Sequence, residues 1–341
     1  MLKSINIGYS GILSTIGNTP LVRLTKVVRD DDLAVFAKLE GLNPGGSIKD
    51  RPAYNIINEG LRSGVIASDA VIIESSSGNM GVGLAQVCSY FGLRLICIVD
   101  LKTSPQNISL MEAYGCEVEL ISIPDPLSGE FLQARIDRVQ SLMSSTKGGY
   151  WPDQYSNLNN SGSHHQTMRE IVTSLNGKVD YLFCATSTCG TLRGCAEYVR
   201  QHRIPTQIYA VDAVGSIIFG GQKAKRLIPG HGAAIMPKLF QVTLADHYVQ
   251  VTDLDCVVGC RRLARQEAIL AGGSSGAVLM AFEQVMHKLK PGSNSVLIFP
   301  DRGERYLDTI YSDEWVKQHF GAIPDAWQPI SAEEICLTAT Y

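Results

Sequence analysis

The stretch LNPGGSIKDRPA, residues 42–53, combines a turn, the start of a helix and a lysine in an unusual place. Its Asn-Pro-Gly-Gly run is typical of a turn, and Ser47 is typical of a residue that caps a helix. Lys49 then falls in the first helical turn, where the helix dipole disfavours a positive charge. The dipole, together with burial in a cleft, lowers the pKa of an amine. We therefore interpret Lys49 as a neutral amine with a chemical role rather than as a solvated charge.

The segments around this turn alternate between short apolar runs and longer runs of helical period. Strands are expected at residues 71–74, 93–100, 117–122, 181–185, 207–212 and 295–300. Helices are expected near residues 79–91, 105–114, 130–145, 190–203, 255–270, 275–289 and 313–319. The expected strands are apolar on both faces, like parallel strands that helices cover on both sides. The alternation predicts an α/β architecture with mainly parallel sheets, in two runs separated by the turn-rich segment 147–160.

The composition excludes several classes of protein. The chain of 341 residues is long enough for two lobes. Its net charge of −3 gives no electrostatic reason to expect nucleic acid or an anionic membrane as a partner. No apolar run approaches the roughly 20 residues that span a bilayer, and the first residues lack the features of a secretory signal. The nine cysteines lack paired CxxC spacing, so we expect reduced thiols in a cytoplasmic protein and no metal site.

Three stretches rich in glycine and hydroxyl side chains stand at expected helix starts. They are ESSSGNMG (74–81), TSTCGT (186–191) and GGSSGA (272–277). Each alone is typical of an ordinary helix cap, but a helix N-terminus with free N–H groups also binds an anion. In an open α/β sheet, loops that follow strands gather at the carboxyl ends of the strands. We expect a phosphate or a carboxylate to bind there.

A lysine brought to such a phosphate site predicts a particular cofactor. A phosphorylated aldehyde held by lysine as a Schiff base is pyridoxal phosphate, whose ring accepts electrons. The GxGxxG fingerprint with a downstream acid and the GxxxxGK[ST] motif, which bind nucleotides, are both missing from the sequence. His164 and His165 form the only histidine pair, and adjacent side chains of a helix do not face each other. We expect a structural or surface role for them rather than metal binding.

Five motifs in order along the chain resemble a known family. They are IGNTPLVRL (16–24), NPGGSIKDRPA (43–53), ESSSGNMGVGLA (74–85), GGSSGA (272–277) and PDRGERYL (300–307). They are similar to the cysteine synthase and cystathionine β-synthase group of the tryptophan synthase β-subunit-like, fold-type II pyridoxal-phosphate enzymes. The resemblance covers about residues 10–320. It implies a homodimer, a larger cofactor-binding lobe of residues 1–42 and 153–320, a smaller mobile substrate-binding lobe of residues 43–152, and a peripheral tail, 321–341.

The resemblance also implies roles for individual residues. Lys49 would form the Schiff base and move protons, Asn79 would hydrogen-bond the cofactor's 3′ oxygen, and Ser274 would face the pyridine nitrogen. The residues implied to cradle the phosphate are Ser187, Thr188, Cys189, Gly190 and Thr191. Those implied to bind the substrate carboxylate are Ser76, Ser77, Gly78, Met80 and Gln154. A serine opposite the ring nitrogen leaves that nitrogen largely unprotonated, which suits β-elimination to an aminoacrylate that a nucleophile then attacks.

The chain departs from the usual sulfhydrylase pattern around the expected active-site mouth. The phosphate loop reads STCGT rather than GTGGT, and the border pair is Gln154-Tyr155 rather than Gln-Phe. The helix near 130–145 reads SGEFLQARIDRV rather than a run of small residues, which places Arg135 near the mouth. Arg135, Tyr155 and Ser187 are expected to bind a larger nucleophile that carries a carboxylate, with Arg135 as a bidentate clamp.

These departures are similar to a narrower branch, the N-(2-amino-2-carboxyethyl)-L-glutamate synthases. Such enzymes join O-phospho-L-serine and L-glutamate into a precursor of L-2,3-diaminopropionate, which is used in siderophore biosynthesis. The alternatives are a cysteine synthase that uses O-acetylserine or O-phosphoserine, and a cystathionine β-synthase. A cofactor-binding regulator without catalytic activity is a further alternative, although the set of Lys49, Asn79 and Ser274 speaks against it.

Overall fold

The computed structural model describes residues 10–28, 32–127 and 129–321. Its strands are β1 (Leu21–Arg23), β2 (Ala34–Leu39), β3 (Val71–Ser75), β4 (Arg94–Asp100), β5 (Glu117–Ile121), β6 (Gly149–Tyr150), β7 (Tyr181–Ala185), β8 (Gln207–Ala213), β9 (His247–Val251) and β10 (Asn294–Phe299). Its α-helices are α1 (Asp50–Arg62), α2 (Asn79–Phe91), α3 (Pro105–Ala113), α4 (Phe131–Ser145), α5 (Leu158–Ser174), α6 (Gly190–Gln201), α7 (Asp253–Gln266), α8 (Gly273–Val285) and α9 (Asp313–Phe320). Short 3-10 helices are η1 (Ile12–Thr15), η2 (Glu40–Leu42), η3 (Val242–Leu244), η4 (Met286–Lys288) and η5 (Glu304–Tyr306).

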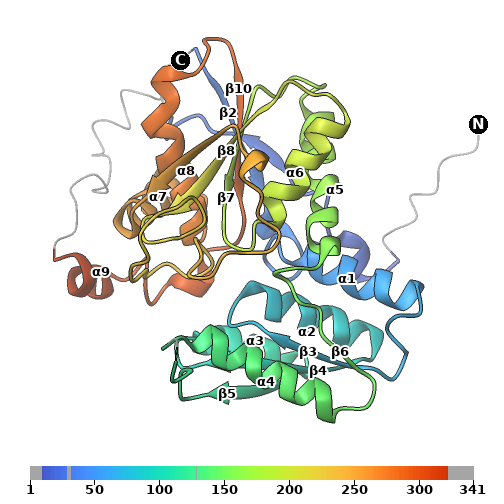
Figure 1. The fold of residues 1–341 in the computed structure, drawn as a ribbon. Helices are drawn as coiled ribbons and strands as arrows, with labels where there is room; N and C mark the ends of the chain where they lie inside the picture. The colour runs from blue at the N-terminus through green and yellow to red at the C-terminus, as the bar shows by residue number, and fades with distance from the viewer. Residues whose placement is uncertain (1–9, 29–31, 128, 322–341) are drawn as a thin grey trace, which may run out of the picture.

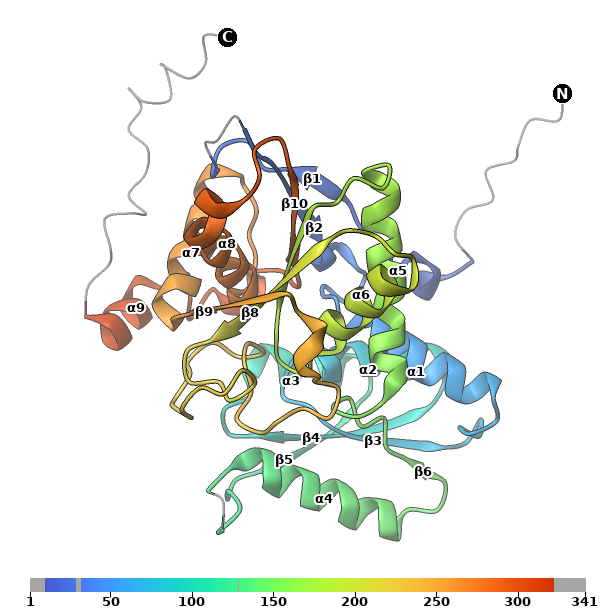
Figure 2. The same ribbon diagram turned by 45° about the horizontal axis from the view of Figure 1, so that its top comes forward.

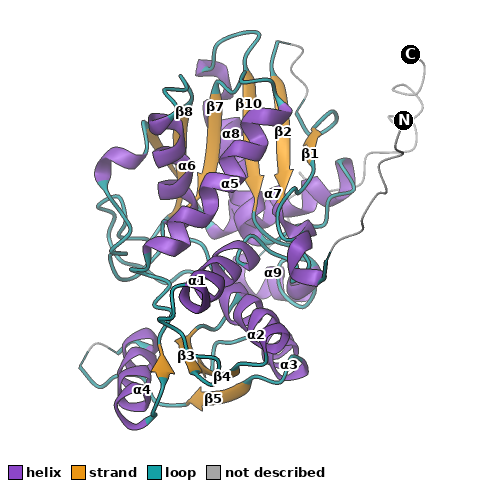
Figure 3. Cartoon of the chain, turned by 90° about the vertical axis from the view of Figure 1, so that its right-hand side faces the viewer, coloured by secondary structure: helices purple, strands orange, loops and turns teal. Residues whose placement is uncertain are grey.

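The larger of two sheets has six strands in the order β1-β2-β10-β7-β8-β9. β1 runs antiparallel to β2, and every other neighbouring pair in this sheet is parallel. The strands come from two distant parts of the sequence, because β1 and β2 precede residue 40 and the other four follow residue 180. Figure 3 shows this sheet above the smaller one, with α1 between them. The prediction of an α/β fold with mainly parallel sheets is confirmed.

Helices cover both faces of the larger sheet, α5 and α6 on one side and α7 and α8 on the other (Figure 1). Leu182 and Cys184 of β7 pack in the same core cluster as Leu192 of α6. Phe183, which lies between them in sequence, packs in the opposite cluster with Val278 of α8. Successive side chains of a strand point to opposite faces. The continuous apolar runs in these strands therefore supply two cores at once.

The smaller sheet has four parallel strands in the order β5-β4-β3-β6. Ile72 packs with Leu84 of α2 on one face, and Ile73 packs with Val139 of α4 on the other. α2 lies on the side that faces the larger sheet, and α4 lies on the far side (Figures 1 and 2). Among the described residues, no helix is long and apolar enough to cross a bilayer.

Three neighbouring strands of the larger sheet position the segments that carry the candidate site residues. β2, β10 and β7 lie side by side and run in the same direction. The chain leaves β2 through η2 to reach Lys49, it leaves β10 to reach Asp301, and it leaves β7 to reach Ser187. Since the carboxyl ends of parallel strands meet at one edge, these three segments converge there.

Candidate active site

The turn that carries Lys49 is fastened to the segment that follows β10. Ser47 forms an antiparallel bridge with Asp301, and the Ile48 N–H donates to the Pro300 carbonyl over 2.7 Å. Gly46 has φ +87°, a left-handed conformation that favours glycine. The Lys49 N–H donates to the Ser47 hydroxyl over 3.2 Å, and α1 begins at the next residue. The predicted turn is confirmed, but the helix begins later than expected: Lys49 is itself the N-cap residue rather than a residue of the first helical turn, and no side chain caps the helix.

The environment of Lys49 favours a neutral amine. Burial lowers the pKa of Lys49, and the nearby Asp301 and Cys189 oppose this effect only in part. Among the described residues, none hydrogen-bonds or forms an ion pair with the Lys49 amine. Its backbone is also closely packed, because a Cβ on Gly83 of α2 would lie 3.1 Å from the Lys49 carbonyl oxygen. Lys49 is therefore a partly buried amine on a closely packed backbone, without a partner in the part of the chain that the structure describes.

Asp301 links the expected cofactor residues to one another. Asn79 donates to Asp301 Oδ2 over 2.8 Å, and the Tyr306 hydroxyl donates to the same oxygen over 2.5 Å. Arg305 donates to the side-chain oxygen of Asn79. Burial raises the pKa of Asp301, and the hydrogen bonds from Tyr306 and Asn79 and the positive charge of Arg305 counter this rise. The sequence analysis assigned no role to Asp301, Arg305 or Tyr306, although all three lie within the quoted motif PDRGERYL.

The turn that carries Ser274 lies against the same aspartate. The Gly272 N–H donates to the Asp301 carbonyl over 3.1 Å. A Cβ on Gly272 would stand 2.1 Å from Asp301 Oδ1, so this approach requires glycine. Ser274 is the second residue of α8 and is largely buried. The structure therefore brings the turn of Lys49, the side chain of Asn79 and the turn that precedes Ser274 to Asp301, while the roles of these residues stay predictions.

The loop from Ser187 to Thr191 joins β7 to the N-terminus of α6. Cys189 precedes α6 with φ +63°, the left-handed conformation that explains why glycine is usual there. Gly190 lies so close to Asn160 that a Cβ would stand 2.3 Å from the amide oxygen. Burial raises the pKa of Cys189 to about 12, so its thiol is protonated and packs as a small apolar group. The loop thus presents helix N–H groups to an anion.

The loop between β3 and α2 carries the residues expected to bind the substrate carboxylate. The Ser76 hydroxyl accepts from the Gly81 N–H over 2.9 Å, and Gln154 donates to the Ser75 carbonyl over 3.3 Å. A Cβ on Gly78 would meet no atom within 4 Å, so the space beside it is open. Met80 differs from the others, because its side chain packs in the core beneath the loop. Only the backbone of Met80 remains for a substrate.

Arg135 lies in the smaller sheet's part of the molecule and is buried. It projects from α4 with 8% of its surface exposed, and its Nε lies 3.2 Å from Asp100 Oδ2. That nitrogen nonetheless has no hydrogen-bond partner among the described residues. Burial raises the pKa of Tyr155, and the positive charges of Arg135 and Arg226 oppose the rise, so Tyr155 lies within electrostatic reach of both guanidinium groups. Arg226, whose Nη1 donates to the His231 carbonyl over 2.6 Å, was not anticipated from the sequence.

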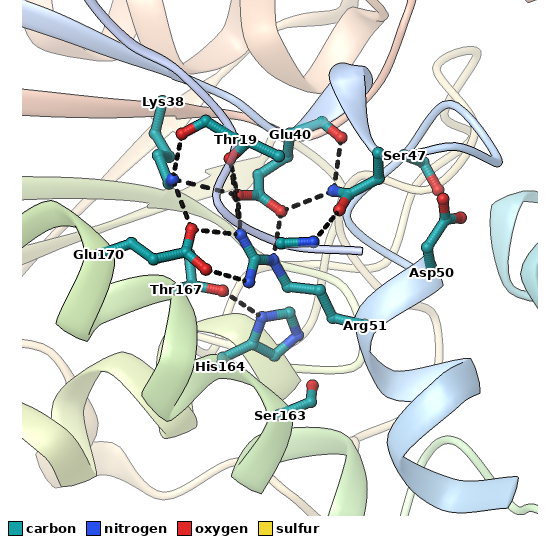
Figure 4. Close-up of polar contacts among 12 residues, drawn as sticks. Thr19, Lys38, Glu40, Ser47, Asp50, Arg51, Ser163, His164, Thr167 and Glu170 are labelled. Carbon is teal, nitrogen blue, oxygen red and sulfur yellow. Dashed lines mark hydrogen bonds and ion pairs between the residues drawn. The ribbon is translucent and has the colours of Figure 1, made fainter. Parts of the chain in front are cut away.

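A buried ionic network anchors the other side of the lysine turn (Figure 4). Glu40 is fully buried and accepts two hydrogen bonds from Arg51 of α1, over 2.6 and 2.7 Å. Arg51 also donates to Glu170 of α5, which in turn binds Lys38 of β2 over 2.6 Å. Two acidic and two basic side chains therefore connect β2, α1 and α5. Sequence reasoning missed this network, because Glu170 is distant in sequence from Lys38, Glu40 and Arg51 and only the folded chain brings it to them.

The comparisons with known proteins agree with this geometry. The family model for pyridoxal-phosphate dependent enzymes matches residues 12–301, and the chain belongs to this family. It is an enzyme of the β-replacement group, which includes cysteine synthases and cystathionine β-synthases.

Three solved structures illustrate the range of this group. The chain is 32% identical to the O-acetylserine dependent cystathionine β-synthase of Helicobacter pylori, with a TM-score of 0.83 over 89% of this chain and 99% of that one. It is 28% identical to O-acetyl serine sulfhydrylase isoform 3 of Entamoeba histolytica, with a TM-score of 0.85 over 99% and 97%. It is also 28% identical to O-ureido-L-serine synthase, with a TM-score of 0.82 over 94% and 98%.

The residues present fit pyridoxal phosphate. The amine of Lys49 has no protein partner in the described residues, and Asp301 Oδ1 is buried without a hydrogen bond there. The loop that ends at Thr191 supplies N–H groups for a phosphate at the start of α6. The site thus combines an amine for the aldehyde, donors for the phosphate and polar groups for the ring.

Proposed function

We propose that this enzyme joins O-phospho-L-serine to L-glutamate. The Cβ–O bond of phosphoserine breaks and phosphate leaves with the bonding electrons, while a Cβ–N bond forms with the amine of glutamate. The amine gives up one proton to the released phosphate or to solvent. The product is N-(2-amino-2-carboxyethyl)-L-glutamate, a precursor of L-2,3-diaminopropionate for siderophore biosynthesis.

The residues around Asp301 serve the first half of this reaction. Bound pyridoxal phosphate supplies the electron sink that makes the Cα–H bond of the amino acid acidic. Lys49, as a neutral amine, takes that proton from Cα. Asn79 and Ser274 orient the ring, and the loop Ser187–Thr191 holds the phosphate. Ser77, Gly78 and Gln154 bind the carboxylate of the first substrate at the open N-terminus of α2.

The observation that carries the choice of second substrate is the buried guanidinium of Arg135, whose Nε forms an ion pair with Asp100 Oδ2 over 3.2 Å. This ion pair engages only Nε and leaves the two terminal nitrogens to donate to a substrate carboxylate. Sulfide has no carboxylate and needs no guanidinium. L-Glutamate carries two carboxylates, and an arginine binds a carboxylate through two parallel hydrogen bonds.

Two neighbouring groups support the same choice. Tyr155 adds a phenol beside Arg135, and Arg226 adds a second cation on the side of the larger sheet. Ser187 adds a hydroxyl at the start of the phosphate loop. This set suits a dicarboxylic amino acid better than a small uncharged nucleophile. The alternatives within the family are synthesis of cysteine or cystathionine, and the similarity to the H. pylori and E. histolytica enzymes favours keeping them in the test.

The decisive experiment offers the purified holoenzyme one first substrate and several nucleophiles. O-phospho-L-serine and, separately, O-acetyl-L-serine are incubated with L-glutamate, sulfide or homocysteine, and the products are identified by mass spectrometry. We expect phosphoserine with glutamate to give the amine-linked product. Formation of cysteine or cystathionine, with no product from glutamate, would refute the proposal.

Arg135 and Arg138 form a matched pair for testing the clamp. Both lie on α4, but Arg138 is half-exposed and pairs with Glu119. We expect Arg135→Ala to raise the KM for glutamate about tenfold or more, while the absorbance change caused by phosphoserine alone stays intact. Arg138→Ala should leave both unchanged. Equal effects of the two substitutions would contradict a specific role for Arg135.

Two further expectations concern the assembly. We propose lobe boundaries near residues 42 and 153, which limited proteolysis would test. We also propose a homodimer, for which analytical ultracentrifugation should give twice the 37.1 kDa mass of one chain.

A further inference from the structure

His164 stands behind the phosphate loop and links two helices. It is fully buried, and its Nδ1 lies 3.3 Å from the hydroxyl oxygen of Thr167, one turn further along α5. Its Nε2 lies 3.4 Å from the hydroxyl oxygen of Thr191, in the first turn of α6. Figure 4 shows the ring beside Arg51 with its contact to Thr167. The adjacent His165 points elsewhere, toward Glu197, and is half-exposed.

Close packing of α5 on α6 fixes the ring in this place. A Cβ on Gly194 of α6 would stand 2.1 Å from the Ser161 carbonyl oxygen and 2.7 Å from the Cβ of His164. The two helices therefore approach each other as closely as backbone atoms allow. The imidazole has little freedom to exchange Thr167 and Thr191 for other partners.

The imidazole of His164 is neutral. Burial lowers its pKa well below the ordinary value, and the neighbouring positive charge of Arg51 acts in the same direction. A neutral imidazole has one nitrogen that donates and one that accepts. Among the described residues, it is also the single hydrogen-bond partner of the Thr167 and Thr191 hydroxyls. The position of the proton on the ring therefore determines whether each hydroxyl donates a hydrogen bond to the imidazole or accepts one from it.

The two tautomers have opposite consequences for the phosphate loop. With the proton on Nδ1, the ring donates to Thr167, and Nε2 accepts the proton of the Thr191 hydroxyl. Thr191 then has no proton left for a bound anion. With the proton on Nε2, the ring donates to the oxygen of Thr191 and accepts from Thr167. The Thr191 proton is then directed away from His164.

We propose that His164 is a positioning residue for the cofactor's phosphate, and that its Nε2–H holds the Thr191 oxygen so that the Thr191 hydroxyl donates to the phosphate. Thr167 fixes this tautomer from the other side of the ring. The chain of donors runs from Thr167 through His164 and Thr191 to the anion. The inference rests on the proposed placement of the phosphate in the loop Ser187–Thr191.

The test compares pyridoxal phosphate with pyridoxal, which lacks the phosphate. Apoenzyme is prepared from the full-length holoenzyme, and dissociation constants are measured by absorbance for both compounds. We expect His164→Leu to raise the constant for pyridoxal phosphate roughly tenfold, because a hydrogen bond to a charged group is lost. The constant for pyridoxal should change less than about twofold. His164→Gln, whose amide N–H replaces Nε2–H, should restore most of the affinity, and His165→Gln is the control.

A second measurement reads the ring directly. Long-range ¹H–¹⁵N spectra of histidine-labelled holoenzyme should show a neutral His164 with its proton on Nε2. Thr167→Val removes the donor to Nδ1 while keeping the side-chain shape, so it should weaken binding of pyridoxal phosphate several-fold. This variant also tests the proposal if His164→Leu does not fold.

Each outcome decides between distinct ideas. Equal losses of affinity for pyridoxal phosphate and pyridoxal, or a proton on Nδ1 in the holoenzyme, would overturn the role of His164. Failure of Thr191→Val to weaken binding of pyridoxal phosphate would instead remove the proposed phosphate site. The choice of glutamate as nucleophile is independent of both results.

Discussion

Glu74 is a carboxyl group buried beneath the proposed substrate loop. Its oxygens accept from the Ser75 N–H over 2.7 Å, from the Trp151 indole over 3.1 Å and from the Gln154 N–H over 3.3 Å. Burial nevertheless raises its pKa to about 7 from an ordinary 4.5. The folded protein therefore binds a proton on Glu74 in a pH range where the unfolded chain has released it.

The raised pKa of Glu74 predicts that the difference in stability between the wild type and Glu74→Gln depends on pH. Below pH 4.5 both the folded and the unfolded wild type carry the Glu74 proton, and the contribution of this carboxyl group to the free energy of unfolding is fully present. As the pH rises through about 7, the wild type loses roughly 3 kcal/mol relative to the variant, which has no group to titrate there. Urea denaturation from pH 4.5 to 8 measures the difference. If the difference in the free energy of unfolding between the two proteins did not change with pH, the folded protein would not retain the proton on Glu74.

Cys189 allows a test of backbone strain in the phosphate loop. Its φ of +63° is especially unfavourable for a β-branched residue. We expect Cys189→Val to lower the free energy of unfolding by about 2 kcal/mol and to weaken binding of pyridoxal phosphate. Cys189→Gly, which adopts this conformation freely, is the control and should stay within about 1 kcal/mol of the wild type. Equal stability of the two variants would mean that the loop relaxes to another conformation.

At the scale of elements, the ionic network connects α1, which follows Lys49, to β2 and α5. Glu40→Gln removes one of the two negative charges between Lys38 and Arg51 while keeping the shape of the side chain. Because a buried cation is then left partly uncompensated, we expect a loss of about 3–5 kcal/mol in the free energy of unfolding. Glu59→Gln, which breaks the exposed pair with Arg62, should cost less than about 1 kcal/mol. Thermal and urea denaturation of the two variants should show this contrast, and similar losses would refute it.

The elements that the sequence predicted well are those with a clear local signal. The helix at 79–91 and the strand at 181–185 match the observed bounds. The helix expected from 255 begins at Asp253, because Thr252 and Asp255 form a capping box. The missed strands β1, β6 and β9 are short or half-polar. β2 carries a charged residue, Lys38, in an otherwise apolar run, and its partner Glu170 is distant in sequence. The missed α5 has few apolar residues, because it buries polar side chains such as His164 and Thr167.

The candidate site followed a similar pattern. The motifs of Lys49, Asn79 and Ser274 could each be predicted to begin a helix, and the family resemblance implied that they share one site. The hub Asp301 could not be identified, since only the folded chain shows that Asn79, Tyr306 and the Gly272 turn converge on it. The structure also places Met80 in the core, a distinction that residue type alone does not reveal.

At the scale of the whole molecule, polar contacts join the two sheets' parts across the active-site mouth. Gln106 of α3 donates to Asp308 over 2.6 Å, and Lys223 forms an ion pair with Glu130. Both contacts are partly exposed, so we expect the double substitution Gln106→Ala with Lys223→Ala to cost less than about 1 kcal/mol in stability. If closure helps to hold substrate, steady-state kinetics should show a KM for the first amino acid that is several-fold higher, with kcat nearly unchanged. An unaltered KM would show that these contacts do not contribute to substrate binding.

The order of strands in the larger sheet has a consequence for biosynthesis. β2 ends at Leu39, but its parallel neighbour β10 is made much later, from Asn294. All strands of the smaller sheet lie between Val71 and Tyr150, so this sheet can form before β2 has β10 as a partner. Because Ile48 is fastened to Pro300, the lysine turn acquires its final position only after β10 has inserted between β2 and β7. A chain that stops before β10 therefore carries the lysine but lacks the segment that positions its turn, so we expect no activity until β10 has been made.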